Sequence, residues 1–234
     1  MKQCVIALFV LCVFVVSGFG QDRTFHVFPQ VADGRFADGS GYFSVLNVTN
    51  LGSAQATCSI RSTPGMAARF SNSGPLVLPG SYAYSEATGG TAPFLSGSIL
   101  LNCTQPVQAS MMYAEFAPNG TVIGMATVLS SPPIHYAVNV LVTGVGWQYG
   151  VALSNTNSFP ITVTFRLDFN GTFVTRDVQI AANSAWVNFA NSVVAVPTTV
   201  GVAFLELYSS SPFSVTELLF DGPVFTTLVP ATEP

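Results

Sequence analysis

Two similar stretches of sequence decide the fold: Tyr42-Phe-Ser-Val-Leu-Asn-Val-Thr-Asn50 and Tyr149-Gly-Val-Ala-Leu-Ser-Asn-Thr-Asn157. They align at a constant offset of 107 residues, from Tyr42 to Tyr149. Each runs into a segment in which apolar and polar residues alternate, which is the period of a half-buried β-strand. The inward positions are Ala54, Ala56, Cys58 and Ile60 in the first copy, and Ile161, Val163, Phe165 and Leu167 in the second. The sequence therefore predicts an internal repeat of strands.

Later segments repeat as well. Residues 97–103 match residues 201–207, and residues 105–111 match residues 211–217. The dipeptides Asn119-Gly120 and Asn170-Gly171 are those preferred in two-residue hairpin turns. With seven or eight short strands per copy, we predict an all-β chain of two tandem immunoglobulin-like β-sandwich domains, residues 21–131 and 132–234. The stretch Ser130-Ser-Pro-Pro133 is the expected linker.

The first twenty residues predict export. Lys2, the apolar run from Cys4 to Val16, and the small residues Gly18 and Gly20 are the parts of a secretory signal peptide. The apolar run is about thirteen residues long, which is short for a membrane span of roughly twenty. We expect a secreted or cell-surface protein with no membrane span once residues 1–20 are removed.

Charge excludes two classes of partner. Only 8% of residues are charged and the formal net charge is −4. Lys2 is the single lysine, so residues 21–234 carry six arginines against eleven carboxylates. Nucleic acids and anionic membranes attract clustered positive charge, so neither is expected as a partner.

The cysteines that remain after residue 20 are Cys58 and Cys103, both on inward strand positions of the first copy. Because export implies an oxidising compartment, we predict a disulfide between them. Two buried free thiols are the alternative. The matching positions in the second copy are Phe165 and Leu207, an apolar pair that we expect to fill the same space between the sheets.

No pattern of residues indicates an enzyme. His26 and His135 have no partner at metal-ligand spacing, and we expect both to be exposed. Sequence motifs for zinc proteases, serine hydrolases and phosphate-binding loops are missing. The carboxylates of strand-like segments do not recur at matching positions, which favours a solvated face over a glycosidase pair. They are Glu115, Glu206, Glu217 and Asp221.

Two groups of residues are candidate binding sites. The segment 33–41 alternates carboxylates with glycines, and Asp33, Asp38 and Ser40 offer oxygens that suit calcium, although Asp-Gly pairs also form ordinary turns. Aromatic residues can stack on sugar rings, but buried aromatics are also common in sandwich cores. The candidates for stacking are Tyr82, Tyr84, Trp147 and Tyr149.

Several of these motifs together resemble a known type of repeat. They are Phe28-Pro-Gln-Val-Ala-Asp-Gly34, Ala37-Asp-Gly-Ser-Gly-Tyr42, Leu78-Pro79-Gly80 and Asp221-Gly-Pro-Val-Phe-Thr-Thr-Leu228. Over nearly all of residues 21–234, the chain resembles a tandem β-sandwich repeat of secreted and surface proteins of environmental bacteria. That repeat has no assigned activity. The resemblance implies bacterial export and a non-catalytic role, and it assigns no functional residues.

Three functions compete. The first is a structural or adhesive extracellular protein, with a protein or polysaccharide partner at the cell surface and with self-association through unpaired sheet edges. The second is a carbohydrate-binding module, which predicts an exposed pair of coplanar aromatics. The third is a periplasmic chaperone with two domains, which the lack of a basic anchoring pair disfavours. No cofactor is expected other than calcium in the segment 33–41.

Overall fold

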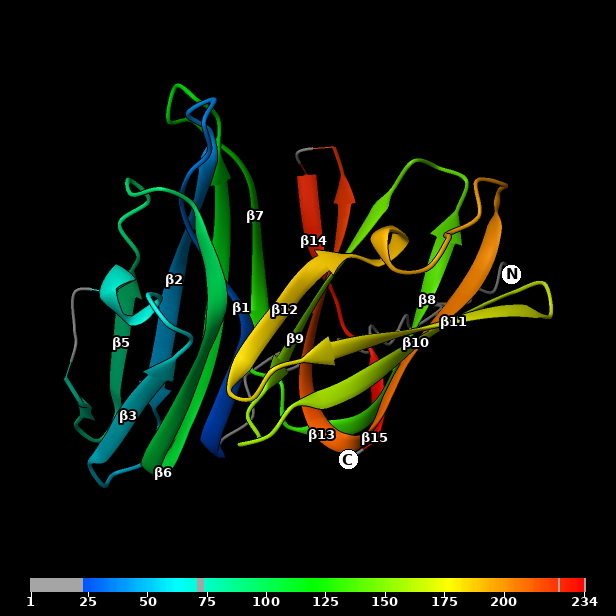
Figure 1. Cartoon of the computed structure of the whole chain (residues 1–234). Coiled ribbons are helices and arrows are strands. Elements are labelled where there is room, and N and C mark those ends of the chain that lie inside the picture. Colours follow the sequence, from blue (N-terminus) through cyan, green and yellow to red (C-terminus); the bar gives the residue numbers. More distant parts are fainter. Residues whose placement is uncertain (1–22, 71–73, 223, 234) are drawn as a thin grey trace, which may run out of the picture.

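The computed structural model describes residues 23–70, 74–222 and 224–233. It consists of strands and two short 3₁₀ helices, η1 (Ala67–Arg69) and η2 (Ala190–Ser192). The strands form two hydrogen-bonded sheets, one from each half of the chain, which lie side by side in Figure 1. The predicted all-β class is confirmed. The predicted signal peptide, residues 1–20, lies outside the described residues. Within those residues, neither helix is long and apolar enough to cross a membrane.

The first domain is folded into two layers of strands. One layer has the order β4-β3-β6-β1, and the other has the order β5-β2-β6-β7. Apolar side chains from both layers meet in a common core. The strands are β1 (Arg23–Arg35), β2 (Gly41–Asn50), β3 (Ala56–Ser62), β4 (Leu76–Leu78), β5 (Tyr82–Ala87), β6 (Leu95–Phe116) and β7 (Val122–Leu129).

The second domain repeats this plan and adds one strand at the end. Its layers have the orders β11-β10-β13-β8-β15 and β12-β9-β13-β14. The segment 130–133, the expected linker, runs between β7 and β8. The strands are β8 (Ile134–Thr143), β9 (Gln148–Asn155), β10 (Ile161–Phe169), β11 (Thr172–Ile180), β12 (Ser184–Phe189), β13 (Gly201–Asp221), β14 (Val224–Leu228) and β15 (Ala231–Glu233).

The longest strand of each domain belongs to both layers. In β6, residues 99–103 pair with β3 and residues 108–116 pair with β2. Pro106 lies between the two segments, where its missing N–H interrupts the ladder, and Pro212 lies at the same point of β13. In an immunoglobulin domain, strands A, B, E and D form one sheet and C, F and G the other. The observed order differs from this one, because β6 pairs with both β1 and β2. The spacing of turns in the sequence locates strands but does not show which strands pair.

The structure also corrects the register of the repeat. The Asn50 side-chain amide donates to the carbonyls of Ala54, Leu78 and Pro79 at 2.7–3.1 Å. Asn155 makes the same three bonds in the second domain, at 2.8–3.2 Å. Asn155, not Asn157, is therefore the counterpart of Asn50, and the offset here is 105 rather than 107 residues. A slip of two residues keeps every side chain on the same face of the strand, so alternation could not reveal it.

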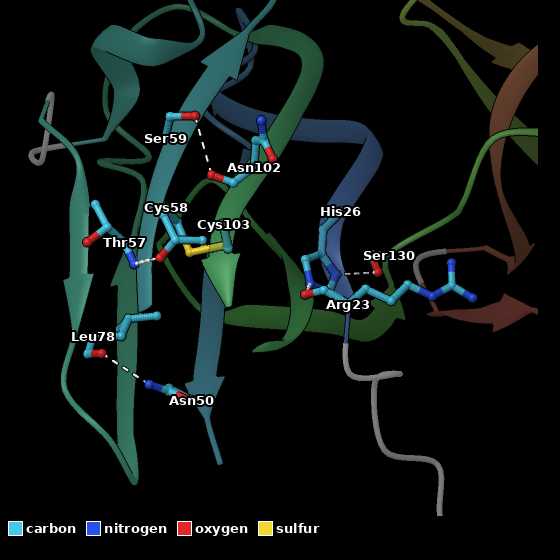
Figure 2. The surroundings of a disulfide bond; sticks show 11 residues. Arg23, His26, Asn50, Thr57, Cys58, Ser59, Leu78, Asn102, Cys103 and Ser130 are labelled. Carbon is cyan, nitrogen blue, oxygen red and sulfur yellow. Dashed lines mark hydrogen bonds between the residues drawn. A yellow bond between two sulfur atoms is a disulfide. The ribbon is translucent and has the colours of Figure 1, made fainter. Parts of the chain in front are cut away.

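The predicted disulfide between Cys58 and Cys103 is present (Figure 2). The two residues lie directly opposite each other on β3 and β6 of one layer, so the bond is cross-strand and does not connect the layers. Phe165 and Leu207 are likewise direct partners, on β10 and β13. The matching of these two pairs is confirmed, and both pairs lie as expected in the buried core between the layers of their domain.

Candidate binding site between the two domains

The domains contact each other through strands that are buried on both faces. In β13, every residue from Phe213 to Leu218 is buried, and β1 and β9 have similar unbroken runs. A strand with one free face would alternate instead. Strands β1, β6 and β7 contact β9, β12, β13 and β14. Leu218 and Phe225 of the second domain join the core of the first, so the two domains share packing.

A cleft of about 340 Å³ lies in this contact and is lined by both domains. The stacked rings of Phe36 and Phe94, with centroids 4.5 Å apart, are on the first-domain side. Phe220 and Phe225 stack at 5.3 Å on the other side, and Tyr42 contacts Phe225 across the boundary. Seven aromatic residues line the cleft: Phe36, Tyr42, Phe94, Tyr113, Phe189, Phe220 and Phe225.

The turn after β1 positions Phe36. The Phe36 backbone N–H donates to the Ser40 carbonyl at 2.8 Å, and Gly39 adopts a positive φ of 88° that closes the turn. The Arg35 guanidinium donates to the Gly39 carbonyl at 2.7 Å. The Phe94 backbone N–H donates to the Arg35 carbonyl, which places both phenyl rings side by side.

The polar groups of the cleft are few and mostly engaged. Tyr113 donates its hydroxyl proton to the Gln30 carbonyl, and Tyr42 is hydrogen-bonded to Glu115. Burial raises the pKa of both phenols, so they are neutral at physiological pH. The side-chain amides of Gln30 and Asn188 complete the lining. This composition suits an apolar or flat group with a few hydrogen-bonding atoms.

The residues expected to hold calcium have other partners. Asp33 is buried, and its carboxylate accepts hydrogen bonds from Arg69 at 2.9 Å and from the Gly90 backbone N–H at 2.7 Å. Asp38 is exposed and accepts both the backbone N–H and the hydroxyl of Ser40. Hydrogen bonds from Ser40 lower the pKa of Asp38. Within the described residues, no group of three His, Cys, Asp or Glu side chains could hold a metal ion.

The four aromatics expected to stack on sugars lie in two different domains. Tyr82 and Tyr84 are on β5; Tyr82 is exposed, whereas Tyr84 packs against the core and donates to Glu86. Tyr149 on β9 is buried and its hydroxyl is hydrogen-bonded to the backbone of Val142. Trp147 packs against the second core. These side chains do not form one platform.

Both histidines have hydrogen-bond partners. His26 was expected to be exposed, but it is buried between β1 and the linker, with Nδ1 2.8 Å from the Ser130 hydroxyl and Nε2 3.0 Å from the Arg23 carbonyl (Figure 2). Burial lowers the pKa of His26. His135 is exposed, and its Nδ1 lies 3.1 Å from the Ser209 carbonyl oxygen.

Glu217 was expected on a solvated face, but the structure buries it inside the second domain. Its Oε2 accepts a hydrogen bond from the Asn139 side chain at 2.5 Å, while Oε1 has no partner among the described residues. Burial raises the pKa of Glu217 to about 7. Phe213 and Val215 are core residues of the same strand, so alternation already placed Glu217 on the inward phase.

The cleft itself was not predicted, because its aromatics come from five strands and two loops whose meeting depends on how the domains pack. The signal in the sequence was the run of consecutive apolar residues Leu218-Leu219-Phe220, where a strand with one free face would alternate. Comparisons of this sequence with protein-family models, curated proteins and solved structures found no match.

Proposed function

We propose that this protein is an exported, non-enzymatic structural or adhesive protein, which holds an apolar group of a protein partner in the cleft between its domains. The observation that carries the proposal is the aromatic lining contributed by both domains. Export is supported by the sequence of residues 1–20 and by the disulfide, which is compatible with an extracellular location. The family resemblance adds a bacterial surface setting.

The chemistry of the lining favours an apolar side chain of a protein over a sugar. Buried aromatic residues contribute much of the binding energy at protein interfaces. A sugar ring needs hydrogen bonds for its many hydroxyls, and the cleft offers the amides of Gln30 and Asn188 for this purpose. The titratable groups that line it, Tyr42 and Tyr113, are neutral phenols already engaged in hydrogen bonds. A binding role fits this set better than acid–base catalysis does.

Carbohydrate binding is a second candidate, and the pair Phe36 and Phe94 favours it. Their rings are stacked at an interplanar angle of 29°, and both are partly exposed, at 42% and 37%. A flat, accessible aromatic surface of this kind can receive the apolar face of a sugar.

Titration of isotopically labelled protein by NMR, with indole and separately with cellobiose, tests both candidates. Indole represents an aromatic side chain, and we expect it to shift the backbone signals of cleft residues such as Gly150 and Asn188. Shifts at these residues with cellobiose instead would favour the carbohydrate candidate. If neither probe changes them at millimolar concentration, the cleft is not a binding site.

A matched pair of variants locates the binding. Val187→Trp places a large ring in the cleft, whereas Val174→Trp makes the same change on β11, outside the cleft lining. The two valines are similarly exposed, at 37% and 36%. We expect Val187→Trp to weaken indole binding at least tenfold and Val174→Trp to leave it unchanged. Equal binding by both variants would place the probe elsewhere.

A further inference from the structure

The contact between the domains joins two different surfaces. The first-domain surface, here named the donor face, is the outer face of β1 and β6 and includes Val27, Ser98 and Leu100. The second-domain surface, named the acceptor face, is the outer face of β9 and β13 and includes Ser154 and Leu218. The Ser98 and Ser154 hydroxyls, which are both buried, meet at 3.3 Å. Because the domains are repeats, each one carries a version of both faces.

The second domain leaves its version of the donor face uncovered. Cys103 matches Leu207, which is an offset of 104 residues. At this offset, Phe204 is the counterpart of Leu100, and Val202 is the counterpart of Ser98. Leu100 is the partner of Val27 on β1, and Phe204 is the partner of Val140 on β8, so Val140 corresponds to Val27.

Exposure differs sharply between the two versions. Val27 is fully buried and Ser98 is 8% exposed, whereas Val140 and Val202 are 53% and 52% exposed. Phe204 is 48% exposed. The second domain thus presents a cluster of apolar side chains on a sheet face, at positions that the repeat uses for contact.

The first domain leaves its version of the acceptor face uncovered. At the offset of 105 residues, Thr49 corresponds to Ser154 and Val45 to Gly150. Val45 pairs with Met112 and Gly150 pairs with Leu218, so Met112 is the counterpart of Leu218. The face is uncharged across β2, β5 and β6, as its members show: Val45, Asn47, Thr49, Ala83, Ser85, Ala87, Ser110 and Met112. Small, uncharged side chains allow a second sheet to approach closely, and methionine adapts its shape to a neighbour.

We propose that the free donor face of one molecule packs on the free acceptor face of a second copy, and so repeats the internal contact between chains. The two surfaces differ, so such a contact is head-to-tail and continues into rows rather than closing as a two-fold dimer. β15 pairs with the edge of β8 but leaves the outward side chains of Val140 and Val202 open. The contact therefore uses sheet faces, and not the sheet edges suggested by the sequence.

Cysteine cross-linking tests the register of this contact. Thr49 and Val202 are the counterparts of Ser154 and Ser98, whose hydroxyls touch inside the molecule. We expect the double variant Thr49→Cys/Val202→Cys, oxidised with copper phenanthroline, to give a ladder of linked chains that reductant dissolves. Each single variant can link no further than a dimer. A control that pairs Val202→Cys with Asn119→Cys, at an exposed hairpin turn, should give no ladder.

Light scattering of the purified, unlinked protein gives an independent readout. We expect the average mass of the unmodified protein to rise with concentration. The variant Phe204→Glu places a charge on the free donor face, opposite Asp168 on β10, and we expect it to have the mass of a monomer. Val77→Glu, at a similarly exposed site on β4, should behave as the unmodified protein does. Thermal unfolding checks that all variants are folded. A monomer at every concentration, or equal ladders from the test and control pairs, would overturn the proposal.

Discussion

Matching inward positions carry different side chains in the two domains. Glu217 occupies the position of Met111, which is fully buried in the first core, and Asn139 occupies that of His26. A methionine needs no hydrogen bond there, whereas a carboxyl group is costly to bury in its charged form. The second domain therefore contains a group whose protonation is coupled to folding.

Glu217→Gln should remove one part of the dependence of stability on pH. The pKa of Glu217 is about 7 in the folded protein, against an ordinary value of 4.5. Between these values the folded state keeps a proton that the unfolded chain has lost, so stability falls as pH rises through this window and is level above it. A shift of this size corresponds to about 3 kcal/mol.

Urea unfolding of both proteins at pH 4.5 and pH 8 measures the effect. From pH 4.5 to pH 8, we expect the free energy of unfolding of the unmodified protein to fall by about 3 kcal/mol relative to that of Glu217→Gln. His26 has a lowered pKa, which favours folding at higher pH. Because both proteins contain His26, this opposite contribution cancels in the comparison. Parallel pH profiles would show that Glu217 is not buried as described.

The inward phase of Glu217 could be derived from the sequence, but its burial could not. Alternation says which face of a strand a residue occupies, and not whether that face is closed from water. His26 was misjudged for a related reason, since its cover comes from Ser130, 104 residues away. Contacts between residues so far apart in the chain leave no local pattern.

Among the strands, the disulfide is the clearest difference between the copies. Cys58 and Cys103 enclose a loop with a sequence separation of 45 residues. In the chain-entropy model, a loop of this length contributes about 4 kcal/mol to the free energy of unfolding.

The double variant Cys58→Ala/Cys103→Ala should therefore unfold at a much lower urea concentration than the unmodified protein. Reductant should lower the midpoint of the unmodified protein toward that of the variant and leave the variant unchanged. A loss below about 1 kcal/mol would mean that packing in this layer, as by Phe165 and Leu207 in the second domain, replaces the bond.

Strand positions and turns were predictable, because the period of two and the Asn-Gly turns are local signals. The alignment of the copies was wrong by two residues at β2 and β9, because such a slip leaves the alternation intact. The passage of β6 and β13 through both layers was also missed. Pro106 and Pro212 marked the places in the sequence, but a proline alone does not distinguish a bend within a strand from a loop.

The low charge of the sequence has a structural explanation in the way the two domains pack. Strands β1, β9 and β13 are buried on both faces, so the positions that would carry charge on a free face carry small or apolar residues. The open face of β2, β5 and β6 on the first domain is also uncharged. A chain of two independent domains joined by a linker would have no need of these features.

The cleft and the matching of the free faces both follow from the way in which the two domains are joined. The double variant Ser98→Cys/Ser154→Cys tests it directly, since the two hydroxyls are 3.3 Å apart across the boundary. We predict that the purified variant forms a disulfide within the monomer, so that alkylation before reduction modifies neither new cysteine and the melting temperature does not fall. Two alkylated thiols in a folded protein would contradict the account.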